Sequence, residues 1–310
     1  MAKKKRLDEE LRFYEVPHGE CVLVLSGPEW RRNYGYFRQH IHNLDEIGFC
    51  LDGHGYLQSG DREWEFHKNT FTFFPHNIPH NTDSETPESL DTWEYLFFDG
   101  KSILEKYGGI SGTQFERLHA QLGGTAIVAD GKRYYAAACL VRGIVKRMYG
   151  PKDGYRRREV GYMLSALIME CASMASDEAT SAPAEENNTE MIGNALSFVD
   201  DHFSEEIRTA DLASACGLSE THFRRLFEKS INMSPNEYVN LVRIQKACDL
   251  IRFSDDSMET VAIKTGFNSQ ASFNRNFLKI LGLPPYRWKR EKESYRAAHK
   301  IKITAKEGWR

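Results

Sequence analysis

The sequence predicts an α+β protein with several domains: an N-terminal β-barrel, a helical segment after it, and a C-terminal domain made only of helices. Three observations support this prediction. Short strand-like runs separated by glycine-containing turns fill the first hundred residues, apolar positions recur at helical spacing between residues 132 and 175, and a pattern of two short helices joined by a glycine occurs twice after residue 190. We therefore expect β-structure first and helices last.

The composition is that of a globular protein. The chain has 310 residues, of which 41% are hydrophobic, enough to bury the cores of about two domains. No run approaches the ~18 apolar residues of a membrane span, and the basic start, residues 1–6, continues into acidic residues, so we expect no membrane segment and no signal peptide. The six cysteines form no CxxC pair, which favours the reducing cytoplasm over a disulfide framework or a zinc ribbon.

The N-terminal strands are short and closely spaced. We expect a small barrel or sandwich over residues 1–110, with strands at 21–25, 46–50, 55–58, 70–74 and 93–98. Two amphipathic helices, 132–149 and 157–175, are expected within a helical segment that spans residues 111–176. The polar stretch 177–189 contains a proline and lacks periodicity, and it predicts a linker before the C-terminal domain.

The repeated pattern consists of a short apolar helix that stops at a glycine and a second helix that begins after a serine. Glycine tolerates the left-handed backbone of such a turn, and serine caps the helix that follows. Two copies about 50 residues apart repeat a whole unit and predict two helix-turn-helix motifs within residues 190–295. The residues that define the copies are Leu212, Gly217, Ser219, Phe223 and Phe227, and Val261, Gly266, Ser269, Phe273 and Phe277.

The second helix of each motif is the one that reads DNA in helix-turn-helix proteins. Arginine suits guanine, and glutamine or asparagine suits adenine, so the polar faces of these helices are expected to contact base pairs. The candidates are Thr221, His222, Arg224 and Arg225 in the first copy, and Gln270, Ala271, Asn274 and Arg275 in the second. The net charge of only −3 gives no independent support for DNA binding. The basic tail, residues 296–310, is expected to face phosphates or to be solvated.

Between the copies, an apolar pattern from Pro235 to Ile251 predicts one long helix. About 16 residues at 1.5 Å each make a spacer of roughly 24 Å. Such a spacer holds the two reading helices in successive major-groove segments and favours some bending of the DNA.

Residues 189–291 resemble the DNA-binding domain of the AraC/XylS family of bacterial transcription regulators. The stretch 266–279 carries the specific part, followed by Gly282, Pro285 and Arg287, and Pro284 and Trp288 are small departures. The resemblance extends to Ser234–Pro235, Tyr238, Arg243 and Lys246–Ala247 in the bridging helix. It implies that Thr221, Arg225, Ala271 and Arg275 occupy base-contacting positions.

The resemblance also implies promoter DNA and RNA polymerase as partners. We expect helix 157–175 to pair two copies of the chain into a homodimer.

Four residues of the N-terminal half follow the cupin metal motif: His40 and His42, then Glu46, then His80. Side chains alternate along a strand, so both imidazoles of the HxH pair point to one face. The set suits zinc, nickel, iron or manganese as a divalent cofactor. It is also consistent with polar groups that line a ligand pocket, which is the interpretation we favour, or with structural histidines, and Asn77 stands where the second cupin motif usually has glycine.

Regulators of the resembled family carry such a barrel as a sensor for a sugar or another small molecule. The expected effector-binding residues are Arg38, His40, His42, Glu46, Tyr56, His80 and Trp93, although Trp93 also suits the barrel core. We therefore expect a cytoplasmic, non-enzymatic transcription activator that senses a sugar or related metabolite. The alternative is a metal-dependent cupin enzyme fused to a DNA-binding domain.

Overall fold

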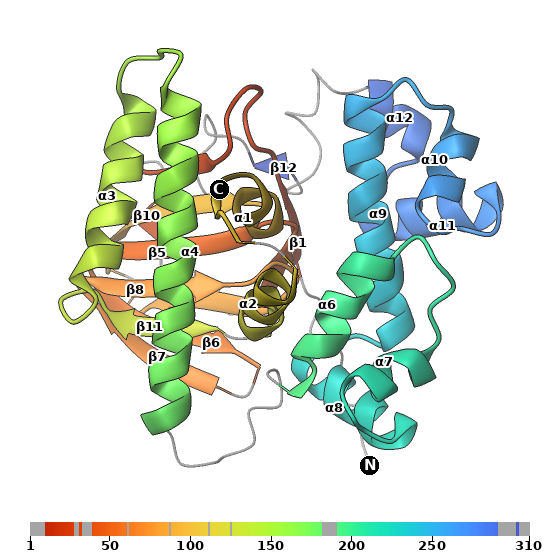
Figure 1. The fold of residues 1–310 in the computed structure, drawn as a ribbon, viewed down its shortest axis with the longest axis horizontal. Coiled ribbons are helices and arrows are strands. Elements are labelled where there is room, and N and C mark those ends of the chain that lie inside the picture. The colour runs from red at the N-terminus through yellow and green to blue at the C-terminus, as the bar shows by residue number, and fades with distance from the viewer. Residues whose placement is uncertain are drawn as a thin grey trace. The chain divides into compact units, whose positions relative to one another are not determined.

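The computed structural model describes residues 10–27, 31–32, 39–60, 62–86, 88–110, 112–124, 126–181, 191–290 and 302–303. The chain divides into two compact units, residues 1–190 with 303–310 and residues 191–302, and each is described by itself (Figure 1). Arg38, the linker from residue 182 onward and most of the basic tail lie outside the described residues.

The first unit contains two β-sheets. One has the order β12 (Lys302–Ile303), β1 (Glu10–Tyr14), β4 (His40–His42), β9 (His80–Ser84), β6 (His54–Ser59) and β7 (Arg62–His67). The other has the order β11 (Ile127–Asp130), β8 (Thr70–Phe74), β5 (Asp45–Asp52), β10 (Asp91–Phe98) and β2 (Leu23–Leu25), with β3 (Arg31–Arg32) paired to β10. Strand β1 runs parallel to β4, and β4 runs antiparallel to β9 with His40 opposite His80.

Strand β10 separates two hydrophobic cores. Its side chains at Trp93, Tyr95 and Phe97 join residues of both sheets in an inner core. The alternate positions Leu96 and Phe98 join a second core built with the helices. Strands β5, β8 and β2 alternate in the same way between the two cores, which explains why they are apolar on both faces.

Four helices cover the outer face of the second sheet: α1 (Gly100–Tyr107), α2 (Thr113–Gly123), α3 (Tyr135–Tyr149) and α4 (Arg156–Ser181) (Figure 1). Helix α4 is longer than the apolar spacing predicted, because the polar residues 176–181 contain neither glycine nor proline and continue the helix to Ser181. The sequence pattern also missed β11, which lies between α2 and α3 and pairs with β8. A single short strand between helices carries too little periodicity to be recognised.

The second unit is entirely helical within residues 191–290. Its helices are α6 (Gly193–His202), α7 (Thr209–Ala215), α8 (Glu220–Ile231), α9 (Pro235–Phe253), α10 (Met258–Lys264), α11 (Gln270–Leu281) and α12 (Pro285–Arg290). Gly217 and Gly266 have φ angles of +67° and +80°, so both turns use the left-handed backbone that glycine permits. Ser219 and Ser269 accept hydrogen bonds from the first turns of α8 and α11. Both helix-turn-helix motifs are thus confirmed.

Helix α9 bridges the two motifs. It has 19 residues, so its axis is about 28 Å long, slightly longer than the sequence pattern predicts. It starts with a capping box, in which Ser234 accepts from the backbone of Glu237 and the Glu237 carboxylate accepts from the backbone of Ser234.

The predicted fold class is confirmed: a β-rich N-terminal unit with helices on one sheet, and a C-terminal helical unit with two helix-turn-helix motifs. All six cysteines are free thiols. Among the described residues, no helix combines the length and the apolar character that crossing a membrane requires.

Candidate functional site

The two-sheet unit brings the four predicted cupin residues together in its interior. His40 and His42 lie on β4, His80 lies opposite on β9, and Glu46 reaches them from β5 in the other sheet. One ligand atom from each residue lies within 4.8 Å of the others, and all four residues are buried. The sharp connection at residues 43–44 joins the two sheets, so residues six positions or fewer apart in sequence face each other across the barrel.

Backbone carbonyls fix the orientation of two of the imidazoles. Nδ1 of His42 lies 2.6 Å from the carbonyl oxygen of Leu44, and Nδ1 of His80 lies 2.9 Å from that of Ile78. A carbonyl oxygen only accepts, so each Nδ1 carries a proton and donates it, and each Nε2 is turned toward the centre of the cluster, where in the neutral imidazole it presents a lone pair. Sequence reasoning missed these orienting groups because a backbone carbonyl has no residue-type signature.

The centre of the cluster therefore collects electron pairs. Nε2 of His42 lies 3.1 Å from Oε2 of Glu46 and 3.4 Å from Nε2 of His80, and Nε2 of His80 lies 3.6 Å from the same carboxylate oxygen. Burial alone raises the pKa of Glu46, but the side chains of His42 and His80 outweigh it and hold that pKa well below its usual range. Burial lowers the pKa of His80 and favours its neutral form. The buried Glu46 carboxylate can therefore be balanced by protons on the two Nε2 atoms or by a bound cation.

The spacing of the ligand atoms fits a divalent metal. With bonds of about 2.1 Å, ligands at right angles lie about 3.0 Å apart, and ligands in a tetrahedron lie about 3.4 Å apart. The three distances among His42, Glu46 and His80, which are 3.1, 3.4 and 3.6 Å, lie within or close to this range. The carbonyl bonds of His42 and His80 are also the outer-shell contacts that metal-bound histidines usually make. His40, His42, Glu46 and His80 are therefore the residues that could hold the metal.

Asn77 shows how the chain accommodates its departure from the cupin pattern. Its φ angle is +60°, in the left-handed region where glycine is usual and asparagine is tolerated. Its backbone N–H donates to the carbonyl oxygen of His42 at 2.8 Å. The loop thus keeps the glycine-like conformation next to the cluster without a glycine.

Of the other predicted effector residues, Arg38 lies outside the described residues, and Trp93 and Tyr56 do not join this cluster. Trp93 is buried in the inner core, where its ring packs edge-on against Phe66 and stacks near Tyr95. Tyr56 alternates with the inward-facing Leu57 on β6 and is 42% exposed, so it lies on the outer face of its sheet. The aromatic groups that do contact the histidines are Phe74, whose ring stacks on His80 at 4.1 Å, and Tyr14 and Phe97, whose rings meet His42 edge-on.

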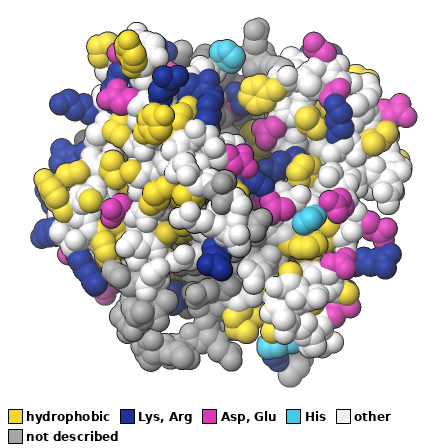
Figure 2. Space-filling model, in the orientation of Figure 1, with side chains coloured by type: hydrophobic (Ala, Val, Ile, Leu, Met, Phe, Trp, Pro, Cys, Tyr) yellow, Lys and Arg dark blue, Asp and Glu magenta, His cyan; other side chains and the backbone are white. Residues whose placement is uncertain are grey.

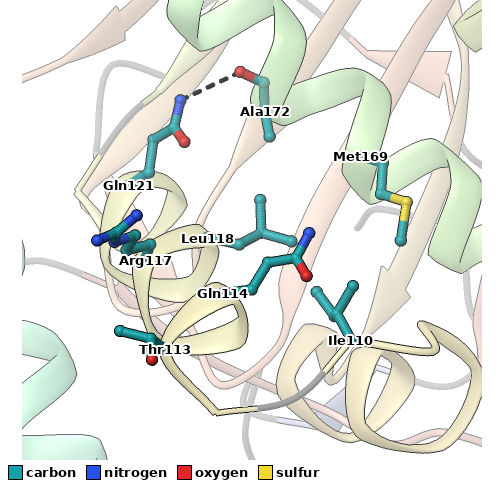
Figure 3. Close-up of a pocket in the computed structure, with 8 residues that line it drawn as sticks. All are labelled: Ile110, Thr113, Gln114, Arg117, Leu118, Gln121, Met169 and Ala172. Carbon is teal, nitrogen blue, oxygen red and sulfur yellow. Dashed lines mark hydrogen bonds between the residues drawn. The ribbon is translucent and has the colours of Figure 1, made fainter.

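A hollow of about 720 Å³ lies at the surface between α2 and α4 (Figure 3). Its apolar lining comes from Ile110, Leu118, Met169 and Ala172, and its polar lining comes from Thr113, Gln114, Arg117 and Gln121. Gln121 Nε2 donates to the carbonyl oxygen of Ala172 at 3.1 Å and ties the two helices together. The sequence pattern did not single out this surface, because its residues come from two helices that only the fold brings together.

The exposed face of α4 carries large apolar side chains beside this hollow. Tyr155, just before the helix, and Tyr162 and Met169 within it recur every seven residues and are 78%, 56% and 38% exposed. Hydrophobic side chains are visible over the surface of this helical layer in Figure 2. We call these three residues the α4 stripe.

In the second unit, the predicted DNA-contacting residues lie on the open faces of α8 and α11. The apolar residues Phe223 and Phe227, and Phe273 and Phe277, are fully buried and fix each helix to its motif. Thr221, Arg224, Arg225, Gln270, Ala271, Asn274 and Arg275 are exposed, and His222 is half-buried. This separation of faces matches the one that the sequence pattern predicts.

The three arginines on these faces differ in whether they already have an acidic partner. Arg224 pairs with Glu220 one turn earlier at 2.6 Å, so its guanidinium is already engaged. Arg225 and Arg275 form no ion pair or hydrogen bond within residues 191–290. These two arginines occupy equivalent positions in the two motifs and are available to a ligand.

Comparisons with known proteins match both units. A family model described as the AraC-like ligand binding domain matches residues 22–167, and one described as a helix-turn-helix domain matches residues 212–291. The HTH-type transcriptional activator RhaS of Klebsiella pneumoniae (strain 342) is 31% identical over 128 residues, 41% of this chain and 44% of that protein. The uncharacterized HTH-type transcriptional regulator YbfP of Bacillus subtilis (strain 168) is 30% identical over 90 residues, 29% of this chain and 30% of that protein.

The matches to these relatives thus span less than half of their length. Among solved structures, ToxT from Vibrio cholerae strain SCE256 with a bound unsaturated fatty acid aligns over 87% of this chain and 93% of its own, with 12% identity and a TM-score of 0.43.

The two family models cover the barrel with its helices and both helix-turn-helix motifs in the expected order. The chain therefore belongs to the AraC family of transcriptional regulators, with an AraC-like ligand binding domain followed by a helix-turn-helix domain.

Proposed function

We propose that this protein is a sequence-specific activator of transcription that reads two neighbouring segments of promoter DNA with α8 and α11 and responds to a small molecule bound in its β-barrel. The observation that carries the proposal is the pair of exposed, unpaired arginines, Arg225 and Arg275, at equivalent positions of two helix-turn-helix motifs. Such a protein acts in the cytoplasm, where promoter DNA and RNA polymerase are found.

The chemistry of the two exposed faces supports different kinds of base contact. Thr221 and Arg225 are four residues apart and share a face of α8, as Ala271 and Arg275 do on α11. Each arginine suits the two acceptors of a guanine, and Ala271 offers only a methyl contact to thymine. Gln270 and Asn274 suit adenine. His222 and Arg224 lie beside them, and Arg224 must release Glu220 before it contacts DNA.

On the effector side, we propose that residues 1–110 bind a sugar or related metabolite at His40, His42, Glu46 and His80. Carboxylate and imidazole groups in a buried site orient the hydroxyl groups of such a molecule. A divalent metal held by the same four residues would supply a Lewis acid that binds an oxygen of the effector. The effector changes DNA occupancy only if it binds one conformation of the protein more tightly than the other.

We also propose that the protein works as a homodimer, with pairing through residues 111–176. The α4 stripe supports this, because large apolar side chains on an exposed helix face are covered in most stable assemblies. The adjoining hollow between α2 and α4 offers room for side chains of the second copy. Two linked copies bind a double site far more tightly than one.

A second candidate is a metal-dependent cupin enzyme fused to a DNA-binding domain. The specific observation in its favour is the complete set of four buried ligands with metal-like spacing. The relatives named above are transcriptional regulators, which supports the regulator. A non-enzymatic role is therefore part of our proposal.

The test uses a DNA duplex selected by the full-length protein from a random library, followed by footprinting and affinity measurement at fixed salt. We expect protection across two successive major-groove segments. Arg225→Ala and Arg275→Ala should each weaken binding by about 1–3 kcal/mol and relax base preference in one segment only.

The matched control is Arg142→Ala, which removes an exposed arginine from α3 in the other unit and should leave the affinity unchanged. Protection of a single groove segment, or full affinity in both arginine variants, would show that the assigned reading helices are wrong.

A further inference from the structure

Arg243 lies in the middle of α9, where the two helix-turn-helix motifs meet. Its guanidinium is half-buried and donates two hydrogen bonds to backbone carbonyls. Nε donates to the carbonyl oxygen of Phe203 at 2.8 Å, and one terminal nitrogen donates to that of Glu205 at 2.6 Å. Both acceptors lie just after the end of α6, in the first half of the DNA-binding unit.

The same guanidinium also contacts the second half. Its carbon lies 5.7 Å from the centre of the Phe267 ring, within the range of a cation–π contact. Phe267 follows the turn of the second motif, and its ring packs edge-on against Phe273 of α11 at 5.5 Å. Arg243 is thus one contact away from the core of the second reading helix.

The two halves also touch directly at this point. A Cβ atom added to Gly266 would lie 2.6 Å from the carbonyl oxygen of Phe203 and 3.0 Å from Nε of Arg243. The turn of the second motif therefore presses against the same carbonyl that Arg243 holds. Gly217, in the equivalent turn of the first motif, has a similar φ angle, but an added Cβ would meet nothing within 4 Å.

These contacts need an arginine. The planar guanidinium donates in two directions in a fixed geometry and stacks on an aromatic ring, whereas a lysine ammonium does neither. Phe203 is the C-cap of α6, and the last carbonyls of a helix have no partner within the helix, so the bond from Nε also gives the Phe203 carbonyl a partner.

We propose that Arg243 is a positioning residue that fixes α8 and α11 at one separation and angle, and thereby sets the spacing between the two DNA segments that the protein accepts. This inference rests on the proposed reading of DNA by both helices. Inserting one base pair between the segments moves them apart by about 3.4 Å and rotates one relative to the other by about 34°. If α8 and α11 are held rigidly, they cannot both contact their DNA segments after such a change.

The first experiment measures binding of the full-length protein to the selected duplex and to duplexes with one base pair inserted or deleted between the two protected segments. We expect the wild type to lose affinity on the order of tenfold for either change. Arg243→Ala and Arg243→Lys should bind the original duplex about tenfold more weakly but discriminate little between spacings. Arg252→Ala removes a cation from the exposed end of the same helix and should retain the full spacing preference.

The second experiment needs no DNA. Because it also uses Gly266→Ala, it still tests the proposal if an Arg243 variant does not fold. Spin labels introduced as unnatural amino acids at the exposed positions Glu228 and Leu278 report the distance distribution between α8 and α11. We expect a narrow distribution in the wild type and in Gly217→Ala, and a broader or shifted one in Arg243→Lys and Gly266→Ala.

The two experiments separate the two proposals. A wild type that selects no DNA would overturn the reading of DNA and leave the distance measurement as the test of positioning. An unchanged distance distribution in both Arg243→Lys and Gly266→Ala, or an unchanged spacing preference in Arg243→Lys, would overturn the role of Arg243.

Discussion

The cluster at the centre of the barrel depends on the proton positions of individual residues. His42 and His80 each donate a hydrogen bond from Nδ1 to a carbonyl two residues away, and this turns both Nε2 atoms toward the Glu46 carboxylate. In a polar solvent such an arrangement relaxes by protonation or by rotation of the rings. In a buried core the rings are held by packing against Phe74 and Phe97, so the carboxylate is balanced either by protons on the histidines or by a bound cation.

At this residue scale we predict a stoichiometric divalent metal in protein purified without chelators and without a histidine tag. Elemental analysis should find about one ion per chain, and His42→Ala should lose it because one of four ligands and its orienting contact disappear. The control His67→Ala changes an exposed histidine on β7 and should retain the ion. A metal-free wild type would instead identify the cluster as a polar ligand site or a structural one.

At the scale of elements, the start of α9 ties the two motifs together a second time. The Glu237 carboxylate caps its own helix through Ser234 and also accepts a hydrogen bond from Lys279 of α11 at 3.2 Å. Partial burial alone would raise the pKa of Glu237, but these hydrogen bonds and the lysine charge outweigh it and lower the pKa to about 2. The ionised form is therefore stabilised by folding.

The sign of the pH dependence follows from this shift. Because the folded-state pKa of Glu237 lies below its ordinary value of 4.5, its contribution to stability is complete above pH 4.5 and is lost as the pH falls toward 2. We predict that Glu237→Gln lowers the melting temperature of the full chain at neutral pH. The difference from the wild type should shrink between pH 4.5 and 2.

Thermal unfolding followed by circular dichroism at several pH values measures this difference. Glu228→Gln, which changes an exposed carboxylate on α8, should show no such convergence. A Glu237→Gln difference that stays constant down to pH 2 would mean that the capping box does not depend on charge.

At the scale of the whole molecule, the α4 stripe bears on assembly. Tyr162 and Met169 lie on one exposed face of a helix of 26 residues, long enough to pair with a second copy over several turns. We predict that Met169→Asp shifts the protein toward the monomer in analytical ultracentrifugation, because a carboxylate would be buried in the interface. It should also weaken binding to a double DNA site more than to a single one.

Tyr135→Asp is the matched control, since Tyr135 is an exposed aromatic residue on the neighbouring helix α3. A wild type that sediments as a monomer at all concentrations tested, or a Met169→Asp variant that remains dimeric, would contradict pairing through α4.

The features that depend on local chemistry could be predicted from the sequence. The glycines at 217 and 266, the serine caps at 219 and 269 and the apolar faces of α8 and α11 predicted both helix-turn-helix motifs and their exposed residues. The HxH spacing predicted that His40 and His42 share a face of a strand. These signals lie within a few residues of each other, where backbone conformation and side-chain periodicity are set by the neighbouring residues themselves.

The features that depend on distant contacts were decided only by the tertiary structure. The pairing of His40 with His80, and the crossing from one sheet to the other at Glu46, determine the spacing of the ligand atoms. Tyr56 was expected near this site, but it faces outward because strand alternation around Leu57 turns it away. The acceptors of Arg243 lie 40 and 38 residues earlier in the chain. Residue types and local spacing carry no information about which backbone atoms a fold brings together, and so these contacts followed from packing alone.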